Sequence, residues 1–148
     1  MARVLIIEDI DFFRLRIKDI VAELGHEAVV VEPGEGENFV EAVSRVVDSL
    51  RRGEEDFDVV LMDGDLGDNP YYGLPPISGH TFAANMLQEK REEGLKLISI
   101  TGNILRDSQR KLYDAHVMKD GHDLVCFGYK LGKELETLFF RDGKLPIA

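Results

Sequence analysis

An apolar run that ends in carboxylates, Asp58-Val59-Val60-Leu61-Met62-Asp63-Gly64-Asp65, lies near the middle of the chain. Four consecutive apolar residues, two of them β-branched, are typical of a strand that is buried on both faces of a parallel sheet. Gly64 ends this run, so Asp63 is expected at the carboxyl end of the strand. In open α/β sheets this edge binds ligands, which makes Asp63 a candidate for chemistry.

The same pattern of an apolar strand followed by acids occurs near the N-terminus. The run from Arg3 to Ile7 is rich in β-branched residues, and Glu8 and Asp9 follow it directly. Helical spacing of apolar residues begins immediately afterwards, with Asp11 as the expected cap. The full set of expected strands covers residues 3–7, 28–31, 59–62, 95–100 and 124–129, and the expected helices cover residues 11–24, 39–50, 78–94, 104–117 and 131–140.

Five alternating pairs of strand and helix predict a parallel sheet with helices on both faces, joined by right-handed crossovers. The 148 residues suit one domain, which we place over residues 1–140 with a tail over 141–148. Between Asp65 and Gly79 the chain is rich in Gly and Pro and cannot form a regular element. A loop of this length is usually a binding loop or a lid, with a disordered tip as the alternative.

Composition restricts the partners of the protein. The formal net charge is −10, which argues against a surface for nucleic acid or for anionic membranes and favours a cationic partner, a metal ion or simple solubility. No apolar run has the length of a membrane span or of a signal peptide core, so we expect a cytoplasmic protein. The single Cys126 is expected to be a small buried hydrophobe.

Polar residues follow four of the expected strands: Glu8 and Asp9, then Asp63, Thr101 and Lys130. Parallel strands would gather them at one edge of the sheet. Carboxylates held close together repel each other, and a set of hard oxygen ligands suits Mg²⁺. A carboxylate can attack a phosphoryl group if cations neutralise the developing charge. Asp63 would be the nucleophile, Lys130 would supply a point charge, and Thr101 would offer a hydroxyl group.

This ordered set resembles the receiver domains of response regulators, and the resemblance extends from Arg3 to about Phe140. It implies a flavodoxin-like sheet with the strand order 2-1-3-4-5. It also implies that Glu8, Asp9 and Asp63 hold Mg²⁺ through their side chains, with the backbone carbonyl of Asp65 as a further ligand. Asp63 would be the phosphoacceptor.

The resemblance assigns the remaining roles as well. Thr101 takes the position of the switch hydroxyl and Lys130 that of the lysine. Phe127, three residues before that lysine, takes the position of the aromatic switch residue. Leu131 departs from the pattern, because the family usually has Pro after the lysine.

A receiver accepts its phosphoryl group from a phosphohistidine on a sensor histidine kinase or on a histidine phosphotransfer protein. The resemblance therefore implies a switch in a two-component phosphorelay, with self-phosphorylation and self-dephosphorylation in place of enzymatic turnover. Output would pass to a downstream protein through the face of the fourth helix, fifth strand and fifth helix. Direct binding of nucleic acid is not expected, and the pattern is compatible with a homodimer.

Two other functions stay open. The segment from Leu61 to Asp65 also resembles the DxD motif of haloacid-dehalogenase-type phosphatases, with Thr101 and Lys130 imitating later motifs. That family has its further acidic pair after the lysine, whereas here Glu8 and Asp9 come first. The other alternative is a receiver-like binding platform without phosphotransfer, which the long loop after Asp65 would favour.

Overall fold

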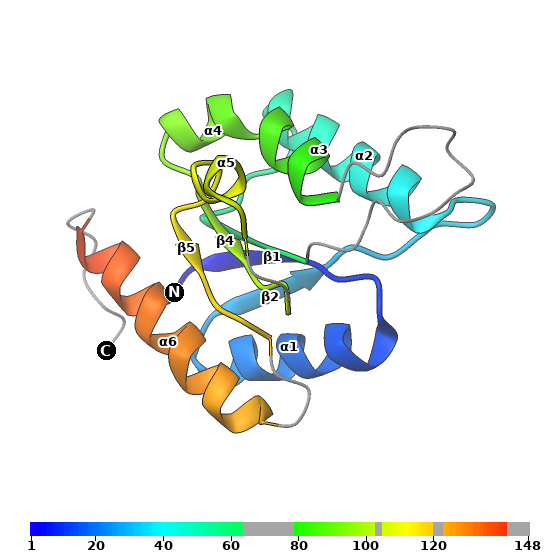
Figure 1. The fold of residues 1–148 in the computed structure, drawn as a ribbon. Helices are drawn as coiled ribbons and strands as arrows, with labels where there is room; N and C mark the ends of the chain where they lie inside the picture. Colours follow the sequence, from blue (N-terminus) through cyan, green and yellow to red (C-terminus); the bar gives the residue numbers. More distant parts are fainter. Residues whose placement is uncertain (64–78, 103–104, 120–122, 142–148) are drawn as a thin grey trace.

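The computed structural model describes residues 1–63, 79–102, 105–119 and 123–141. Its centre is a parallel sheet of five strands in the order β2-β1-β3-β4-β5 (Figure 1). This order confirms the predicted topology. The strands are β1 (Arg3–Ile7), β2 (Glu27–Val30), β3 (Val59–Met62), β4 (Lys96–Ser99) and β5 (Ala115–His116).

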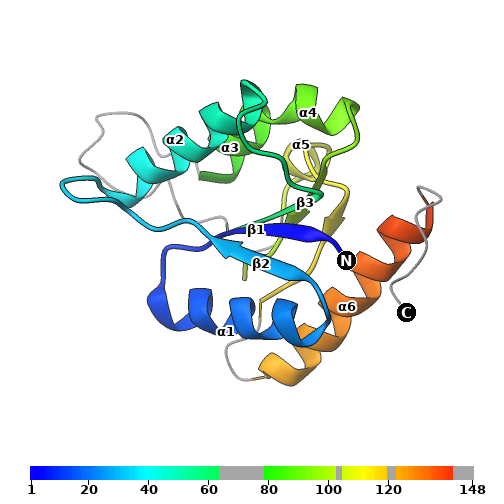
Figure 2. The same cartoon turned by 180° about the vertical axis from the view of Figure 1, so that it is seen from behind.

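Helices cover both faces of the sheet, as predicted (Figures 1 and 2). Helices α1 (Asp11–Glu23) and α6 (Leu124–Arg141) lie on one face, and α2 (Phe39–Arg51), α3 (Gly79–Met86), α4 (Gln88–Glu92) and α5 (Asp107–Arg110) lie on the other. Alternate strand residues supply two cores, because successive side chains of a strand point to opposite faces. Ile6 and Leu61 belong to the core beneath α1 and α6, whereas Ile7 and Met62 belong to the core beneath the other helices.

The first half of the chain follows the prediction closely, with one correction at the start of α1. The residue at the N-cap is Ile10, and its side chain makes no capping hydrogen bond. Asp11, the predicted cap, is the first residue of the helix and forms an ion pair with Arg14. An acid in the first turn still stabilises the helix through the helix dipole.

The expected helix over residues 78–94 is divided into α3 and α4. Leu87 lies between them, is fully buried and has a backbone conformation outside the helical region. The side chain of Gln88 donates hydrogen bonds to the carbonyls of Ala84 and Leu112, at 2.9 and 3.0 Å. The predicted cap Ser78 lies outside the described residues.

The predicted strand over residues 124–129 is wrong, because these residues begin the long helix α6. Phe127, Leu131, Leu135 and Leu138 recur at helical spacing and are buried in one core. The apolar run at the start of this helix has the composition of a strand, but only the longer spacing shows which face is buried.

The predicted helix over residues 104–117 is also largely wrong. Its only described helical part is α5, and Ala115 and His116 form β5. Contacts with β4 fix this short strand: the backbone N–H of Asp114 donates to the carbonyl of Leu97 at 2.8 Å, and its carboxylate accepts from the N–H of Leu97 at 2.9 Å. Long-range pairing of this kind leaves no local pattern in the sequence.

Two glycines of α6 allow this helix to approach α1 closely. A β-carbon added at Gly128 would lie 3.3 Å from Cγ2 of Ile20, and one added at Gly132 would lie 3.1 Å from Cδ2 of Leu24. The two neighbouring side chains differ in how freely they can move, because Leu24 is 39% exposed whereas Ile20 is partly buried and β-branched.

No described helix has both the length and the apolar character needed to cross a membrane.

We expect opposite effects from substituting these two glycines. Alanine gains about 1 kcal/mol of helix propensity over glycine, but overpacking costs about 1–3 kcal/mol where a neighbour cannot move. Gly132→Ala should therefore raise the free energy of unfolding slightly, because Leu24 can turn away, and Gly128→Ala should lower it by about 1 kcal/mol. Urea unfolding of both variants measures this difference, and equal effects would contradict the packing argument.

Candidate functional site

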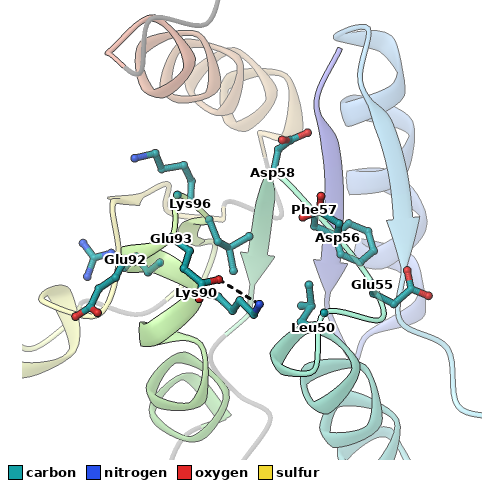
Figure 3. Close-up of a pocket in the computed structure, with 13 residues that line it drawn as sticks. Leu50, Glu55, Asp56, Phe57, Asp58, Lys90, Glu92, Glu93 and Lys96 are labelled. Carbon is teal, nitrogen blue, oxygen red and sulfur yellow. Dashed lines mark ion pairs between the residues drawn. The ribbon is translucent and has the colours of Figure 1, made fainter.

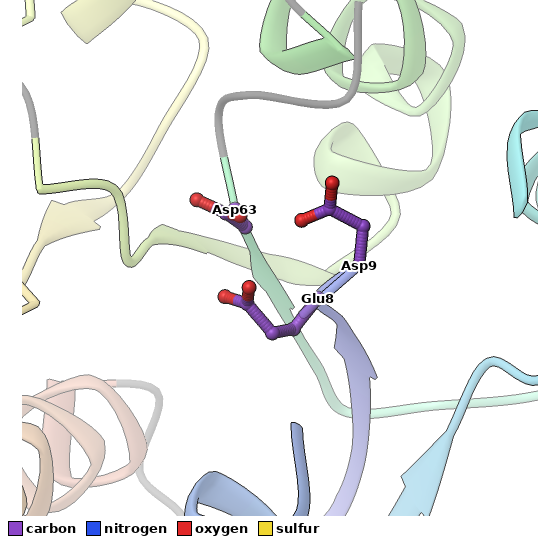
Figure 4. A group of neighbouring side chains, drawn as sticks. All are labelled: Glu8, Asp9 and Asp63. Carbon is purple, nitrogen blue, oxygen red and sulfur yellow. The ribbon is translucent and has the colours of Figure 1, made fainter. Parts of the chain in front are cut away.

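Three carboxylates meet at the carboxyl ends of β1 and β3, as Figure 4 shows. One oxygen from each of Glu8, Asp9 and Asp63 lies within 4.8 Å of the other two. The Glu8 and Asp63 side chains are buried, and Asp9 is exposed. The backbone N–H of Asp63 donates to the carbonyl of Ile7 at 2.8 Å, which continues the pairing of the two strands into the site.

Burial and mutual repulsion disfavour the ionised forms of this cluster. Burial, and then the charge of Asp63, raise the pKa of Glu8 from 4.5 to about 8, although Lys119 acts in the opposite direction. Burial and the charge of Asp63 also raise the pKa of Asp9. The Glu8 carboxylate accepts a hydrogen bond from the backbone N–H of Ile10 at 3.2 Å.

The cation at this cluster is Lys119. Its ammonium lies 2.9 Å from Oε2 of Glu8 and 3.5 Å from Oδ1 of Asp63, and its side chain is only 10% exposed. Burial lowers the pKa of Lys119, but the charges of Asp63 and Glu8 outweigh this effect and raise the pKa overall. Lys119 is therefore the charged partner of two carboxylates at the strand ends.

Lys130, which the sequence analysis placed here, lies elsewhere. It is an exposed residue in the first half of α6, because the strand that was to carry it is helical. Phe127, the predicted switch residue, belongs to the same helix and is buried in the core beneath α1 and α6. The position three residues before Lys119 is occupied by His116 of β5, and burial lowers the pKa of its imidazole.

A signal for Lys119 is present in the sequence but weak. The only apolar residues directly before it are Val117 and Met118, and the strand itself has just two residues. The backbone extends the strand pairing beyond β5, since the N–H of Val117 donates to the carbonyl of Ser99 at 2.8 Å. This short apolar run closed by a lysine is the signal that could have located the strand end, but residues 104–117 were predicted to be helical instead.

Thr101 lies two residues after the end of β4, and its side chain is buried. Its backbone carbonyl accepts a hydrogen bond from the N–H of Lys119 at 3.3 Å, so the lysine and the threonine belong to neighbouring strand ends. Asp65, the remaining predicted ligand, lies outside the described residues. The structure therefore places Glu8, Asp9, Asp63 and Thr101 at the predicted edge.

The donor set fits a hard divalent cation. The three carboxylates offer oxygen ligands alone, and Mg²⁺ is typically bound by one or two carboxylates together with water and phosphate oxygens. Burial, and then the charge of Asp63, raise the pKa of Glu8 and of Asp9, so a further positive charge would favour the ionised cluster. Bound Mg²⁺ would supply the missing positive charge next to Asp63.

A second concave region lies at the opposite edge of the sheet (Figure 3). This groove, of about 770 Å³, runs between the loop before β3 and the loop before β4. Its lining carries both signs of charge, for example Asp56 and Asp58 beside Lys90 and Lys96. The groove is separate from the carboxylate cluster and does not contribute to that site.

No protein-family model matches the chain, and no curated protein matches it by sequence. Solved structures do resemble it. The response regulator TrrA of Thermotoga maritima, solved with Mg²⁺ and BeF, is 23% identical, with a TM-score of 0.64 over 93% of this chain and 99% of its own. A receiver domain protein of Clostridium thermocellum is 16% identical, with a TM-score of 0.64 over 97% of this chain and 98% of its own.

The receiver domain of a sensor histidine kinase from Pseudomonas aeruginosa, with a magnesium ion coordinated in its active-site cleft, is also similar. It is 18% identical, and its TM-score is 0.63 over 93% of this chain and 96% of its own. These neighbours share the sheet order described above. The chain therefore has the fold of response-regulator receiver domains.

The raised pKa of Glu8 predicts a loss of stability with increasing pH. Folded Glu8 binds its proton more tightly than unfolded Glu8, so this contribution is complete below pH 4.5 and is lost as the pH rises through about 8. Glutamine cannot ionise. In chelator, Glu8→Gln should therefore exceed the parent in free energy of unfolding above pH 8, by about 2 kcal/mol.

Urea unfolding from pH 5 to pH 9 measures this difference. The control is Glu23→Gln, which changes an exposed glutamate at the end of α1. Parallel profiles for Glu8→Gln and the parent across this range would contradict the assignment.

Proposed function

We propose that the protein is a phosphorylation-dependent switch of a two-component phosphorelay, with Asp63 as the phosphoacceptor. The observation that carries this proposal is the placement of Asp63. Its carboxylate is buried at a strand end, within 4.8 Å of the oxygens of Glu8 and Asp9 and 3.5 Å from the ammonium of Lys119. The receiver fold of the chain supports the same function.

Mg²⁺ would be held by the carboxylates of Glu8, Asp9 and Asp63 and by the backbone carbonyl of Asp65. When bound, it would neutralise negative charge on the oxygens of the transferring phosphoryl group. The acidic cluster supports this assignment. So do two structural neighbours, one of them solved with Mg²⁺ and BeF and the other with a magnesium ion in its active-site cleft.

In the transfer, an oxygen of Asp63 forms a bond to phosphorus while the bond between phosphorus and the donor imidazole nitrogen breaks. The electron pair of that bond leaves with the imidazole. Lys119 stabilises the charge that spreads over the phosphoryl oxygens, because its ammonium already lies beside the attacking carboxylate. Attack of water on phosphorus later returns Asp63 to its carboxylate form.

The switch itself would involve Thr101. Its hydroxyl group can donate to a phosphoryl oxygen on Asp63, and its backbone is hydrogen-bonded to that of Lys119. A shift of Thr101 would therefore displace the backbone of Lys119, beyond the end of β5. The donor would be a phosphohistidine on a sensor histidine kinase or a histidine phosphotransfer protein, and a downstream protein in the cytoplasm would read the altered surface.

Incubation with a small phosphodonor and Mg²⁺ should add a single phosphoryl group to the protein, detected as a shift in intact mass. Asp63→Asn should abolish the addition, because an amide cannot form the acyl phosphate. A chelator should suppress it as well. Steady release of phosphate without an adduct would favour a phosphatase, and an inert protein would favour a binding platform.

Replacing the two candidate lysines should give unequal effects. Lys119→Met removes the ammonium beside Asp63 and should slow phosphoryl uptake by about 100-fold. Lys130→Met changes an exposed residue of α6 and should leave the rate within about twofold. Rates from time courses of intact mass make this comparison, and a large effect at Lys130 alone would restore the original assignment.

A further inference from the structure

An aromatic ring of α1 lies against the lysine of the site. The ammonium nitrogen of Lys119 is 4.4 Å from the centroid of the Phe13 ring. Phe13 lies in the first turn of α1 and is partly buried at the margin of the core beneath α1 and α6. At this distance the negative face of the ring attracts the ammonium, with an energy that increases as water is excluded.

The ring completes the surroundings of the ammonium. Glu8 lies 2.9 Å and Asp63 lies 3.5 Å from the same nitrogen atom, and the side chain is only 10% exposed. Lysine has a flexible stem and a strongly hydrated charge, so a position near Asp63 has to be imposed from outside. Two carboxylates and one ring together define that position.

The placement of Phe13 follows from the chain itself. Glu8 and Asp9 directly follow β1, and α1 begins two residues after Asp9, at Asp11. The turn between β1 and α1 therefore places both the two acids and the Phe13 ring near Lys119. A displaced α1 would move the acids and the ring together.

We propose that Phe13 is a positioning residue for phosphoryl transfer, whose ring holds the Lys119 ammonium against Glu8 and Asp63 and excludes water from it. This inference rests on the proposed function. It states that an aromatic face is required at position 13, beyond the apolar volume that the core needs. Leucine fills volume without binding a cation, and tyrosine keeps the cation-binding face.

The test measures the rate of phosphoryl uptake from a small phosphodonor with Mg²⁺. Phe13→Leu should slow uptake about tenfold, and Phe13→Tyr should stay within about twofold of the parent. In a Lys119→Met background, Phe13→Leu should have almost no further effect, because the ring then has no ammonium to hold. A purely structural role would not produce this dependence on Lys119.

The chain offers a matched control at the opposite edge of the sheet. Arg3 lies over the ring of Phe57 at the same distance, 4.4 Å, and Phe57 is buried. Phe57→Leu removes a comparable contact far from the site, so it should lower stability and leave the uptake rate within about twofold. The rates are compared at a temperature where urea unfolding shows every variant to be folded.

Each outcome has a defined meaning. Equal slowing by Phe13→Leu and Phe13→Tyr, or an undiminished effect of Phe13→Leu in the Lys119→Met background, would overturn the inference while the proposed function stands. Absence of uptake by the parent protein would overturn the proposed function, and with it the role in transfer. The same double-mutant cycle on urea unfolding then decides whether the ring holds the ammonium, with no coupling counting against it.

Discussion

The pairing of β1 with β3 holds three carboxylates together at one edge of the sheet, against their mutual repulsion. Glu8, Asp9 and Asp63 bring their carboxylates within 4.8 Å of one another, two of them buried. Neighbouring strands hold them there, because backbone pairing of β1 with β3 continues up to the N–H of Asp63. The backbone hydrogen bonds between the two strands thus oppose the repulsion between the carboxylates. Positive charge is needed to balance the three carboxylates. Within the described residues, Lys119 provides it through its contacts with Glu8 and Asp63.

The delivery of Lys119 depends on very little regular structure. Strand β5 has two residues, yet pairing with the β4 segment continues to Lys119, whose N–H donates to the carbonyl of Thr101 at 3.3 Å. This hydrogen bond joins Thr101, whose hydroxyl would contact the phosphoryl group, to Lys119, whose ammonium would contact the same group. A displacement of either backbone therefore reaches the other directly. Such coupling requires only adjacent strand ends, so the proposed switch would not need a long edge strand.

The sequence predicted the parts of the fold that depend on local pattern and missed those that depend on distant contacts. The apolar runs before Glu8 and Asp63 are bounded by acids, so both strands were predicted correctly, together with the position of these two residues at the strand ends. The segment from Leu124 was read as a strand because its first residues are apolar, and this error carried the lysine assignment to Lys130. Only the spacing of Phe127, Leu131 and Leu135 distinguishes a helix here. Strand β5 is fixed by its pairing with β4, so its local sequence signal is weak.

The Glu8 carboxylate has several competing partners. In Glu8, Oε2 lies 2.9 Å from the ammonium of Lys119 and Oε1 accepts from the N–H of Ile10, while a pKa of about 8 lets a proton compete near neutral pH. A divalent cation at Glu8 would have to displace or share these partners. Asp9 is exposed and lies on the side from which an ion arrives from solvent. In the proposed magnesium site, Glu8 would therefore share its carboxylate between the ion and Lys119, whereas Asp9 would offer its carboxylate directly from the solvent side.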